Sequence, residues 1–343
     1  MKFPSRKLWL KYHLLKLFRF FISGKKYPAP VREQIRKVLI IRQDNRIGNL
    51  LFVTPLLQLI NEELGVKPDV ICGGAFNEIF SDNPLVGQVL IYNQKEFIKK
   101  PWRFISFLRS LHKSRYDLVI DCKKVFSFNN ALLTMMSKRH RIGFKNPVSS
   151  LYLDAEFDLT GVDHTVHESI LLALPAAAML GVDNSRIPFM SYQLKPLNLQ
   201  LPDNFIAMHI GGRGNKSIPV ELVNELCREL LKSYDGKLAV IYGPDEEGKA
   251  GAVIMDSRIV KVRPSGINEL AYWISNAKLF ITPDTGPLHV ASALNQKIAA
   301  IFSVTPSISY GPRSKSASLV LNPVEKTVPE MAEGILKLLK QHL

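Results

Sequence analysis

The feature that most constrains the fold is an alternation of short apolar runs and helical segments. Residues 37–42 read Lys-Val-Leu-Ile-Ile-Arg, and a continuous apolar run of this length predicts a buried strand. A polar turn over 43–49 and a helix over 50–64 follow, with Thr54-Pro55 near the helix start. Residues 69–72 then predict a second buried strand. This order is typical of a strand–helix–strand unit.

The same order returns in the second half of the chain. It comprises a strand over 205–209, a Gly-rich turn over 211–216, a helix over 220–233 and a strand over 237–242. Further strands are predicted at 89–92, 116–121 and 141–144, and further helices at 101–113, 129–138 and 167–180, the last ending at Gly181. Alternating strands and helices form parallel sheets with right-handed crossovers. The sequence therefore predicts an α/β protein with two Rossmann-like domains.

The domain boundaries follow from a change of pattern between the two halves. Residues 188–202 are irregular and punctuated by proline, which indicates a hinge. We expect an N-terminal domain over 36–190, a hinge over 191–203 and a C-terminal domain over 204–343. Because ligands bind outside the carboxyl ends of parallel strands, we expect the two sheets to face a central cleft.

The N-terminal segment, residues 1–30, carries an unusual charge. The chain has a net charge of +15, and this segment holds eight Lys or Arg and no acidic residue. Charges interrupt its apolar run too often for a spanning helix or a signal peptide. It predicts a helix lying on an anionic membrane surface, with a helix packed on the protein's own body as the alternative. The remaining sequence has no basic-aromatic patch typical of nucleic-acid binding.

The cysteines argue against a metal site. Cys72, Cys122 and Cys227 are far apart and have neither paired ligand spacing nor a disulfide framework. They are typical of a reducing, cytoplasmic setting. We therefore expect no metal.

The turn that begins at Pro283 carries the clearest chemistry. The apolar strand 278–282 leads into Pro-Asp-Thr-Gly-Pro, and an Ala-rich helix follows. Asp284 offers a carboxylate, Thr285 a hydroxyl, and Gly286 begins a helix whose backbone N–H groups bind anions. Asp284 is also suited to cap that helix. The turn predicts a ligand with phosphates and hydroxyls, such as a nucleotide sugar.

Three other turns carry polar groups at predicted strand ends. In the turn after residue 42, Asp44 is suited to act as a general base, or the turn is an ordinary polar one. In the Gly-rich turn, Gly211 and Gly212 let backbone approach a diphosphate while Arg213 and Lys216 supply charge; the alternative is a flexible surface turn. After the strand 237–242, Asp245 can accept hydrogen bonds from ribose hydroxyls, or it belongs to a solvated charge run.

Taken in order, these segments resemble glycosyltransferase family 9, the bacterial heptosyltransferases of lipopolysaccharide core assembly. The resemblance rests on KVLIIR, RIGN, AMHIGG with a lysine four residues later, IYGPDEE, ITPDTGPLHVASAL and SVTPSISYGP. It covers about residues 36–325. It implies a GT-B fold and metal-independent, inverting transfer without a cofactor. The donor would be a nucleotide sugar, usually ADP-heptose, and the acceptor an anionic, lipid-linked saccharide at the inner membrane.

The resemblance also implies roles for particular residues. Lys216 corresponds to the lysine near the donor phosphates, and Asp245 to the acid near the ribose. Asp284 would contact the donor sugar, while Thr285 and Gly286 would contact the diphosphate. His289, in the same block, completes the donor-binding set. The basic N-terminal segment is consistent with a peripheral position on the cytoplasmic face of the inner membrane.

Two departures from the family pattern bear on the chemistry. The family has Gly-Asp where this chain has Gly48-Asn49, and that aspartate is the expected acceptor-activating base. Asparagine cannot take up a proton at neutral pH, so either Asp44 replaces the base, Asn49 positions the acceptor, or activity is low. The family's Lys-x-Trp-Pro is Lys216-Ser-Ile-Pro219 here, which leaves the donor open. The alternatives are a nucleotide-sugar epimerase on the same scaffold and a catalytically weak saccharide-binding relative.

Overall fold

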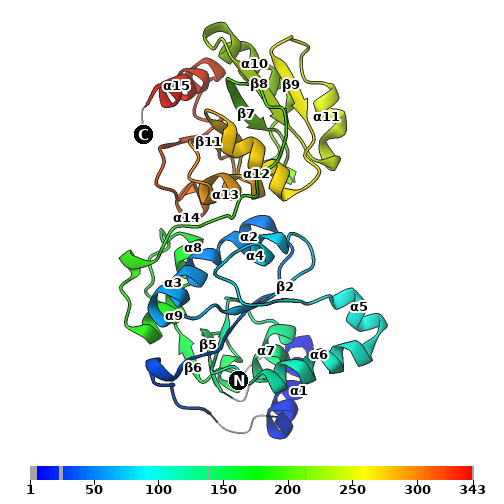
Figure 1. Cartoon of the computed structure of the whole chain (residues 1–343), viewed down its shortest axis with the longest axis vertical. Coiled ribbons are helices and arrows are strands. Elements are labelled where there is room, and N and C mark those ends of the chain that lie inside the picture. Colours follow the sequence, from blue (N-terminus) through cyan, green and yellow to red (C-terminus); the bar gives the residue numbers. More distant parts are fainter. Residues whose placement is uncertain (1–5, 23–25, 137–138, 213, 342–343) are drawn as a thin grey trace. The chain divides into compact units, whose positions relative to one another are not determined.

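The chain divides into two units, each with its own sheet (Figure 1). A computed structural model describes residues 6–22, 26–136, 139–212 and 214–341. Unit 1 comprises Met1–Asp163 and Ser169–Pro188, and unit 2 comprises His164–Glu168 and Phe189–Leu343. A short segment of the first half, His164–Glu168, thus belongs to unit 2, which the sequence pattern did not indicate.

Unit 1 is built on a six-stranded parallel sheet with the order β3-β2-β1-β4-β5-β6. The central strand β1 lies between β2 and β4, with Leu39 level with Asp69 and Val119. Its five residues are buried on both faces, as their apolar sequence predicted. The strands are β1 (Val38–Arg42), β2 (Asp69–Cys72), β3 (Val89–Ile91), β4 (Leu118–Asp121), β5 (His140–Phe144) and β6 (Ala155–Phe157).

Helices connect these strands and cover the sheet. The described helices of this half are α1 (Arg6–Ile22), η1 (Arg32–Gln34), α2 (Ile47–Leu51), α3 (Thr54–Leu64), α4 (Glu78–Ser81), α5 (Gln94–Lys99), α6 (Pro101–Ser114), α7 (Phe128–Met135), η2 (Ser149–Leu151), α8 (Glu168–Leu171), α9 (Leu174–Leu180) and η3 (Asn184–Arg186).

Two helices that the sequence predicted as continuous are each broken. The expected helix 50–64 is α2 followed by α3, and Pro55 lies in the first turn of α3. The expected helix 167–180 is α8 followed by α9, and Pro175 lies in the first turn of α9. Proline has no N–H to donate to the preceding turn, so a helix restarts there. Helix α9 does end at Gly181, which has the left-handed φ of 68°.

Unit 2 repeats the architecture with the strand order β12-β11-β10-β7-β8-β9, all parallel. Its strands are β7 (Phe205–His209), β8 (Lys237–Ile241), β9 (Ile259–Val262), β10 (Phe280–Pro283), β11 (Ile298–Ile301) and β12 (Ser318–Leu321). Its helices are η4 (Gly214–Lys216), α10 (Val220–Ser233), η5 (Pro244–Glu246), α11 (Glu247–Gly251), α12 (Ile267–Asn276), α13 (Gly286–Ala293), α14 (Ser307–Tyr310) and α15 (Val328–Lys340).

Each sheet has one point where the strand order reverses. In unit 1 successive strands run outward from β1 on one side and from β4 on the other. In unit 2 the corresponding neighbours are β7 and β10. A crevice opens outside the carboxyl ends of the strands at such a point, and ligands of open α/β sheets bind there. The turns after β1, β4, β7 and β10 are therefore where the site residues are expected.

The N-terminal helix α1 has a packed side and an exposed side. Leu15 is fully buried in a cluster with Ala131 and Met135 of α7 and with Tyr152. On the other side Trp9, Leu10, Leu14, Leu17, Phe18 and Phe20 are exposed. Helix α1 therefore packs on unit 1, as in the second of the two expectations, while it still presents apolar side chains to the outside. No helix among the described residues has the length and apolar character needed to span a membrane.

The segment that follows α1 is held by the sheet of unit 1. Tyr27 donates its backbone N–H to Asp154 at 3.0 Å, and its carbonyl lies 2.9 Å from the His140 ring. The Arg141 guanidinium lies over the Tyr27 ring and forms a buried, bidentate ion pair with Asp154. This segment is thus fixed to residues of β5 and to Asp154, which precedes β6.

Candidate functional site

In unit 2, an ion pair joins the turns after the two strands at which the order reverses. Lys216, in the turn after β7, lies with its Nζ 2.5 Å from Oδ2 of Asp284, in the turn after β10. The Asp284 side chain is almost fully buried, whereas that of Lys216 is 42% exposed. The structure therefore brings together two residues that are 68 positions apart in sequence and places a cation at the sheet edge expected to bind ligand.

The residue after Asp284 is the N-cap of helix α13. Thr285 precedes Gly286 with extended backbone angles, and its side chain makes no capping hydrogen bond. The Thr285 hydroxyl instead lies 3.4 Å from Nδ1 of His209, the last residue of β7. The expectation that Asp284 caps the helix is wrong, because Thr285 occupies that position. Pro287 has no N–H and the Leu288 N–H donates to the Thr285 carbonyl at 3.1 Å, so the N–H groups of Thr285 and Gly286 are the ones at this helix start that suit an anion.

Two buried histidines interact in this part of unit 2, and one of them, His289, lies close to the ion pair. Burial lowers the pKa of His289, one turn into α13, to about 3; the charges of His167 and Lys216 act in the same direction, and Asp284 opposes them. Burial also lowers the pKa of His167 to about 4, and its Nε2 lies 3.0 Å from the Gly311 carbonyl. Both imidazoles are neutral at neutral pH. The sequence indicated no role for His167, because it comes from the segment that unit 2 takes from the first half.

The turn after β7 requires glycine at two positions, because a side chain there would clash with neighbouring atoms. A Cβ at Gly212 would lie 2.6 Å from the carbonyl oxygen of Lys216, and one at Gly211 would lie 2.7 Å from the His209 ring. Only glycine allows the turn to fold back this tightly, which brings Lys216 toward the strand end. Arg213, which the sequence also placed at the diphosphate, lies outside the described residues.

In the turn after β8, Glu246 and not the expected Asp245 lies beside Gly211. Asp245 is exposed on η5, whereas Glu246 accepts a hydrogen bond from the Gly243 N–H at 2.9 Å. The Glu246 carboxyl carbon would lie 3.0 Å from a Cβ at Gly211. Lys249 donates to the Ile210 carbonyl at 2.7 Å and so supports the same turn. The role of Asp245 stays a prediction.

In unit 1, the two residues considered for the base lie together. Asn49 donates its side-chain amide to Oδ2 of Asp44 at 2.6 Å. Oδ1 of Asp44 accepts the backbone N–H groups of Asn45 and Arg46 at 2.9 and 3.1 Å, so the carboxylate is fixed in its turn. Arg42 approaches the same carboxylate at 3.9 Å. Because Oδ2 retains a second lone-pair direction, the pair is able to accept a further proton donor.

The turn that carries Asp44 is fixed to the end of β2. The Asn45 side chain accepts the Ala75 N–H at 3.1 Å, and Gly73 donates to the Asp44 carbonyl at 3.1 Å. A Cβ at Gly73 would lie 2.0 Å from Oδ1 of Asn45, so glycine is required there. The turn is therefore positioned by the adjacent strand as well as by its own hydrogen bonds.

A buried acid that the sequence did not single out lies at the end of β4. Asp121 is 2% exposed and accepts hydrogen bonds from Asn130 and from the Lys123 N–H at 2.7 and 3.0 Å. Burial raises its pKa to about 6, and Asn130, Lys123 and Arg42 oppose that rise. It was missed because a single Asp at the end of an apolar strand carries no motif.

The chemistry that these groups can perform is the binding of anions and hydroxyls and the transfer of a proton. Among the described residues, no group of three His, Cys, Asp or Glu side chains is placed to hold a metal ion. Lys216 and the start of α13 provide positive charge, Asp284 accepts hydrogen bonds, and Asp44 provides a carboxylate.

Comparison with known proteins places this fold and these turns in context. A solved structure of the Escherichia coli heptosyltransferase WaaC with ADP superposes with a TM-score of 0.71 at 20% identity, covering 88% of this chain and 98% of that one. A UDP-GlcNAc 2-epimerase from Methanocaldococcus jannaschii superposes with a TM-score of 0.52 at 12% identity, covering 90% and 93%. The fold is GT-B, the class predicted from the sequence.

The sequence comparisons define the family. Residues 104–337, more than half of the chain, match glycosyltransferase family 9 (heptosyltransferase), and the chain belongs to that family. Lipopolysaccharide heptosyltransferase 1 of Campylobacter coli is 24% identical over 79% of this chain and 85% of its own length. The protein of the same name from Escherichia coli K12 is 22% identical over 88% and 98%. The protein is thus a heptosyltransferase-like glycosyltransferase. The family match begins at residue 104, so the turn that carries Asp44 lies outside it.

Proposed function

We propose that the protein transfers a sugar, with heptose from ADP-heptose as the expected donor, onto an anionic, lipid-linked saccharide of the lipopolysaccharide core. The observation that carries the proposal is the Lys216–Asp284 ion pair at the strand-order reversal of unit 2, beside the start of α13. A phosphate needs positive charge and N–H donors, and a sugar needs a hydrogen-bond acceptor. The two turns provide all three together, because Lys216 pairs with Asp284 next to the N–H groups of Thr285 and Gly286.

The donor would bind with its diphosphate at Lys216 and at the N–H groups of Thr285 and Gly286. Asp284 would then accept hydrogen bonds from the sugar hydroxyls once the ligand displaces the Lys216 ammonium. The ion pair supports this arrangement because it keeps the Lys216 cation beside Asp284, next to the position proposed for the diphosphate. Lys216 is the exposed partner and therefore the one able to move.

The transfer proceeds by displacement at the anomeric carbon. A base takes the proton of an acceptor hydroxyl, the hydroxyl oxygen forms a bond to the anomeric carbon, and the bond to the diphosphate breaks with inversion. The leaving diphosphate carries away the bonding electron pair, and its charge is stabilised by Lys216 and the N–H groups of Thr285 and Gly286 without a metal. In this proposal Asp44 is the base and Asn49 orients its carboxylate, which the 2.6 Å hydrogen bond supports.

The place of action follows from the nature of the acceptor. A lipid-linked acceptor is met at a membrane surface, and we place the protein peripherally on the cytoplasmic face of the inner membrane. The exposed Trp9, Leu17 and Phe20 of α1, beside Lys11 and Lys16 of the same helix, support an interfacial helix. No nucleic-acid partner is proposed.

A donor screen tests the proposal at its first step. Thermal unfolding is measured with ADP-, UDP- and GDP-sugars, each with and without a divalent metal, because a ligand that binds the native state raises its stability. We expect stabilisation by ADP-heptose that does not require metal. No stabilisation by any nucleotide sugar would contradict the transferase proposal.

Product analysis separates the alternatives. Donor consumption that depends on a lipopolysaccharide-core acceptor supports transfer. Release of a free epimerised sugar without acceptor would support an epimerase. Binding without donor consumption would support a saccharide-binding relative in which Asn49 has removed the chemistry.

A further inference from the structure

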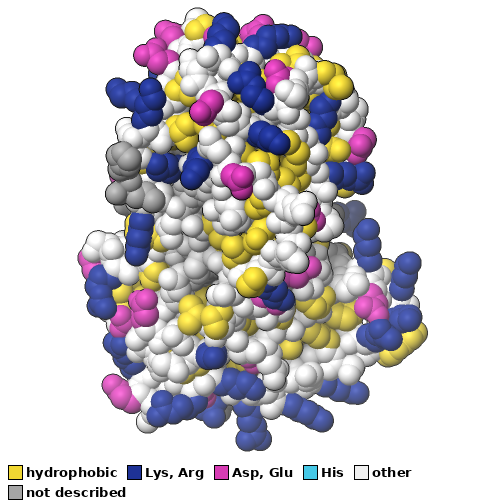
Figure 2. Space-filling model, turned by 45° about the horizontal axis from the view of Figure 1, so that its top comes forward, with side chains coloured by type: hydrophobic (Ala, Val, Ile, Leu, Met, Phe, Trp, Pro, Cys, Tyr) yellow, Lys and Arg dark blue, Asp and Glu magenta, His cyan; other side chains and the backbone are white. Residues whose placement is uncertain are grey.

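Helices α5 and α6 form a projection of unit 1 whose outer side is both apolar and basic (Figures 1 and 2). The inner side of this projection packs on unit 1 through Phe97, Phe104, Phe107 and Leu111, which contact Tyr92 and Tyr116. On the outer side Ile98 is 74% exposed, Trp102 63% and Ile105 49%. Large exposed apolar side chains grouped in this way indicate an interaction surface.

The charge of this projection has one sign. Residues 94–115 contain seven Lys or Arg and a single acid, Glu96, which pairs with Arg103. Figure 2 shows dark-blue basic side chains beside yellow hydrophobic ones at the right edge of unit 1, where α5 and α6 project. A surface of this composition complements an anionic one and repels other cationic proteins.

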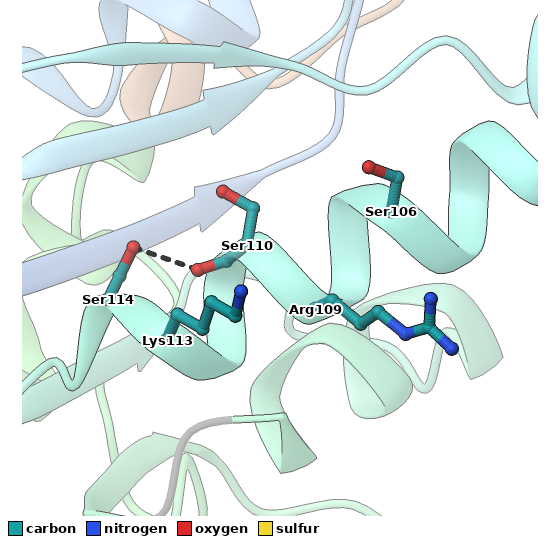
Figure 3. Close-up of a pocket in the computed structure, with 5 residues that line it drawn as sticks. All are labelled: Ser106, Arg109, Ser110, Lys113 and Ser114. Carbon is teal, nitrogen blue, oxygen red and sulfur yellow. Dashed lines mark hydrogen bonds between the residues drawn. The ribbon is translucent and has the colours of Figure 1, made fainter.

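The basic and apolar groups lie along one side of α6. Trp102, Ser106, Arg109 and Lys113 follow one another at spacings of three or four residues, which places them on one face of a helix. Arg109, Lys113 and three serines line a pocket of about 450 Å³ on this face (Figure 3). In Figure 3 the Lys113 ammonium and the Arg109 guanidinium extend in different directions, so this face offers two separate cations beside several hydroxyls, which suits the phosphates of neighbouring lipids.

The N-terminal helix α1 packs against the same helix, α7, as α6 does. Helix α7 contacts α1 through Ala131 and Met135, and it contacts α6 through Leu133 and through the Met136 carbonyl, 3.2 Å from the His112 ring. Helices α1 and α6 therefore pack on one common helix. Both present Trp and other apolar side chains next to Lys and Arg on their exposed sides.

We propose that the outer face of α5 and α6 binds the surface of an anionic phospholipid bilayer, with Trp102 and Ile105 inserted and with Arg109 and Lys113 each at a lipid phosphate. Tryptophan is favoured at the membrane interface, and cations next to it are attracted to anionic headgroups. This contact adds a second membrane element to α1 and does not depend on which sugar is transferred.

The full-length protein is sedimented with vesicles of phosphatidylcholine containing phosphatidylglycerol and with vesicles of phosphatidylcholine alone. Replacing Arg109 and Lys113 by Gln is expected to weaken binding to the anionic vesicles about 30-fold at low salt, since each such cation contributes about a factor of five. The matched control replaces the exposed Lys237 and Lys326 of unit 2 by Gln, which removes the same charge and should leave binding unchanged.

A second pair of variants tests insertion. Trp102→Ser with Ile105→Ser is expected to weaken binding about tenfold. Met255→Ser with Val324→Ser, which are 92% and 84% exposed on unit 2, is the control. In a Trp9→Phe background the remaining tryptophans are Trp102 and the buried Trp273, and lipids brominated in their acyl chains should quench the fluorescence of Trp102.

Binding of the α6 variants equal to that of the parent, or no quenching of Trp102, would overturn the proposal even if α1 still holds the protein on vesicles. Binding only to vesicles that carry the acceptor glycolipid would assign the face to the acceptor and overturn it as well. The variants leave unit 2 intact, so stabilisation by a nucleotide sugar should persist in all of them. Failure of this inference is thereby distinguished from failure of the proposed transferase activity.

Discussion

Asn49 donates its side-chain amide to the Asp44 carboxylate at 2.6 Å. The sequence offered these residues as alternatives, one replacing the missing base and the other positioning an acceptor. The structure joins them, since Asn49 fixes one carboxylate oxygen and the backbone of the turn fixes the other. An asparagine at position 49 thus orients the nearby acid, where an aspartate would repel it.

Replacing Asp44 by Asn should therefore reduce kcat by about 10² to 10⁴, the contribution typical of a positioned general base. Asn49→Ala should reduce kcat less, because it removes one hydrogen bond while the carboxylate remains. The measurement is single-turnover sugar transfer with saturating donor. An unchanged rate for Asp44→Asn would exclude Asp44 as the base.

Asn49→Asp restores the residue of the family pattern and provides a second test. Two carboxyl groups would then lie at hydrogen-bond distance, and one of them must hold a proton near neutral pH. We expect the pH profile of kcat to move to higher pH relative to the parent. A profile that stays in place would show that the carboxylate at position 44 takes no part in the proton transfer.

Asp284→Ala should abolish turnover with the protein still folded, and Lys216→Ala should weaken donor binding. The Lys216 side chain is 42% exposed, so loss of its partner leaves no buried cation behind. Donor affinity is measured by calorimetry and folding by circular dichroism. Lys232→Ala, which removes a lysine from a solvated pair with Glu229, is the control and should bind donor normally. Full activity of Asp284→Ala would reject its role.

Acid should destabilise the protein through its buried histidines. Burial lowers the pKa of His167 and His209 to about 4, whereas an unfolded histidine titrates near 6.5. Between these values only the unfolded state takes up the proton. Stability is therefore complete above about pH 6.5 and falls toward about pH 4, by about 1.4 kcal/mol per histidine and pH unit. Urea denaturation across this range, with His167→Gln showing a shallower fall, measures the effect.

Asp121 should change stability with pH in the opposite direction, so that its contribution falls as pH rises. Burial raises its pKa to about 6, so between about pH 4 and about pH 6 the folded state holds a proton that the unfolded state has released. The free energy of unfolding contributed by this group falls as pH rises through that range and stays reduced above it. Asp121→Asn should stabilise the protein by about 2 to 3 kcal/mol at neutral pH. A loss of stability would show instead that the charge is needed there.

The packing of α1 is testable at two leucines of the same helix. Leu15 is fully buried, so Leu15→Ala should reduce the free energy of unfolding by about 2 to 5 kcal/mol. Leu17 is 55% exposed, and Leu17→Ala should change it by less than about 0.5 kcal/mol. Equal effects in urea denaturation would mean that α1 does not pack as described.

The sequence predicted most of the strands that are buried on both faces, because a run such as Val-Leu-Ile-Ile in β1 allows few other structures. It missed β6, β9 and β12, whose residues are partly exposed and less uniformly apolar. It also missed the fully buried β11, a run of only four residues that includes two alanines. It joined α2 to α3 and α8 to α9, since apolar periodicity continues through Pro55 and Pro175 while the helical hydrogen bonds do not.

The candidate site, too, was predicted only in part. Local turns such as Asp284–Gly286 were identified because their chemistry lies within a few residues. The Asp44–Asn49 bond and the proximity of His167 to His289 were not predicted, because they depend on how a turn closes and on where a distant segment returns. Spacing along the chain carries no information about either.

The five residues His164–Glu168 have a consequence for anyone who wishes to study the halves separately. They belong to unit 2 although unit 1 resumes at Ser169, so the chain passes between the units three times. A fragment that begins at Phe189 would lack His167 and its contact with Gly311. No single cleavage releases an intact unit 2, and a circularly permuted chain or a grafted peptide would be needed to rebuild it.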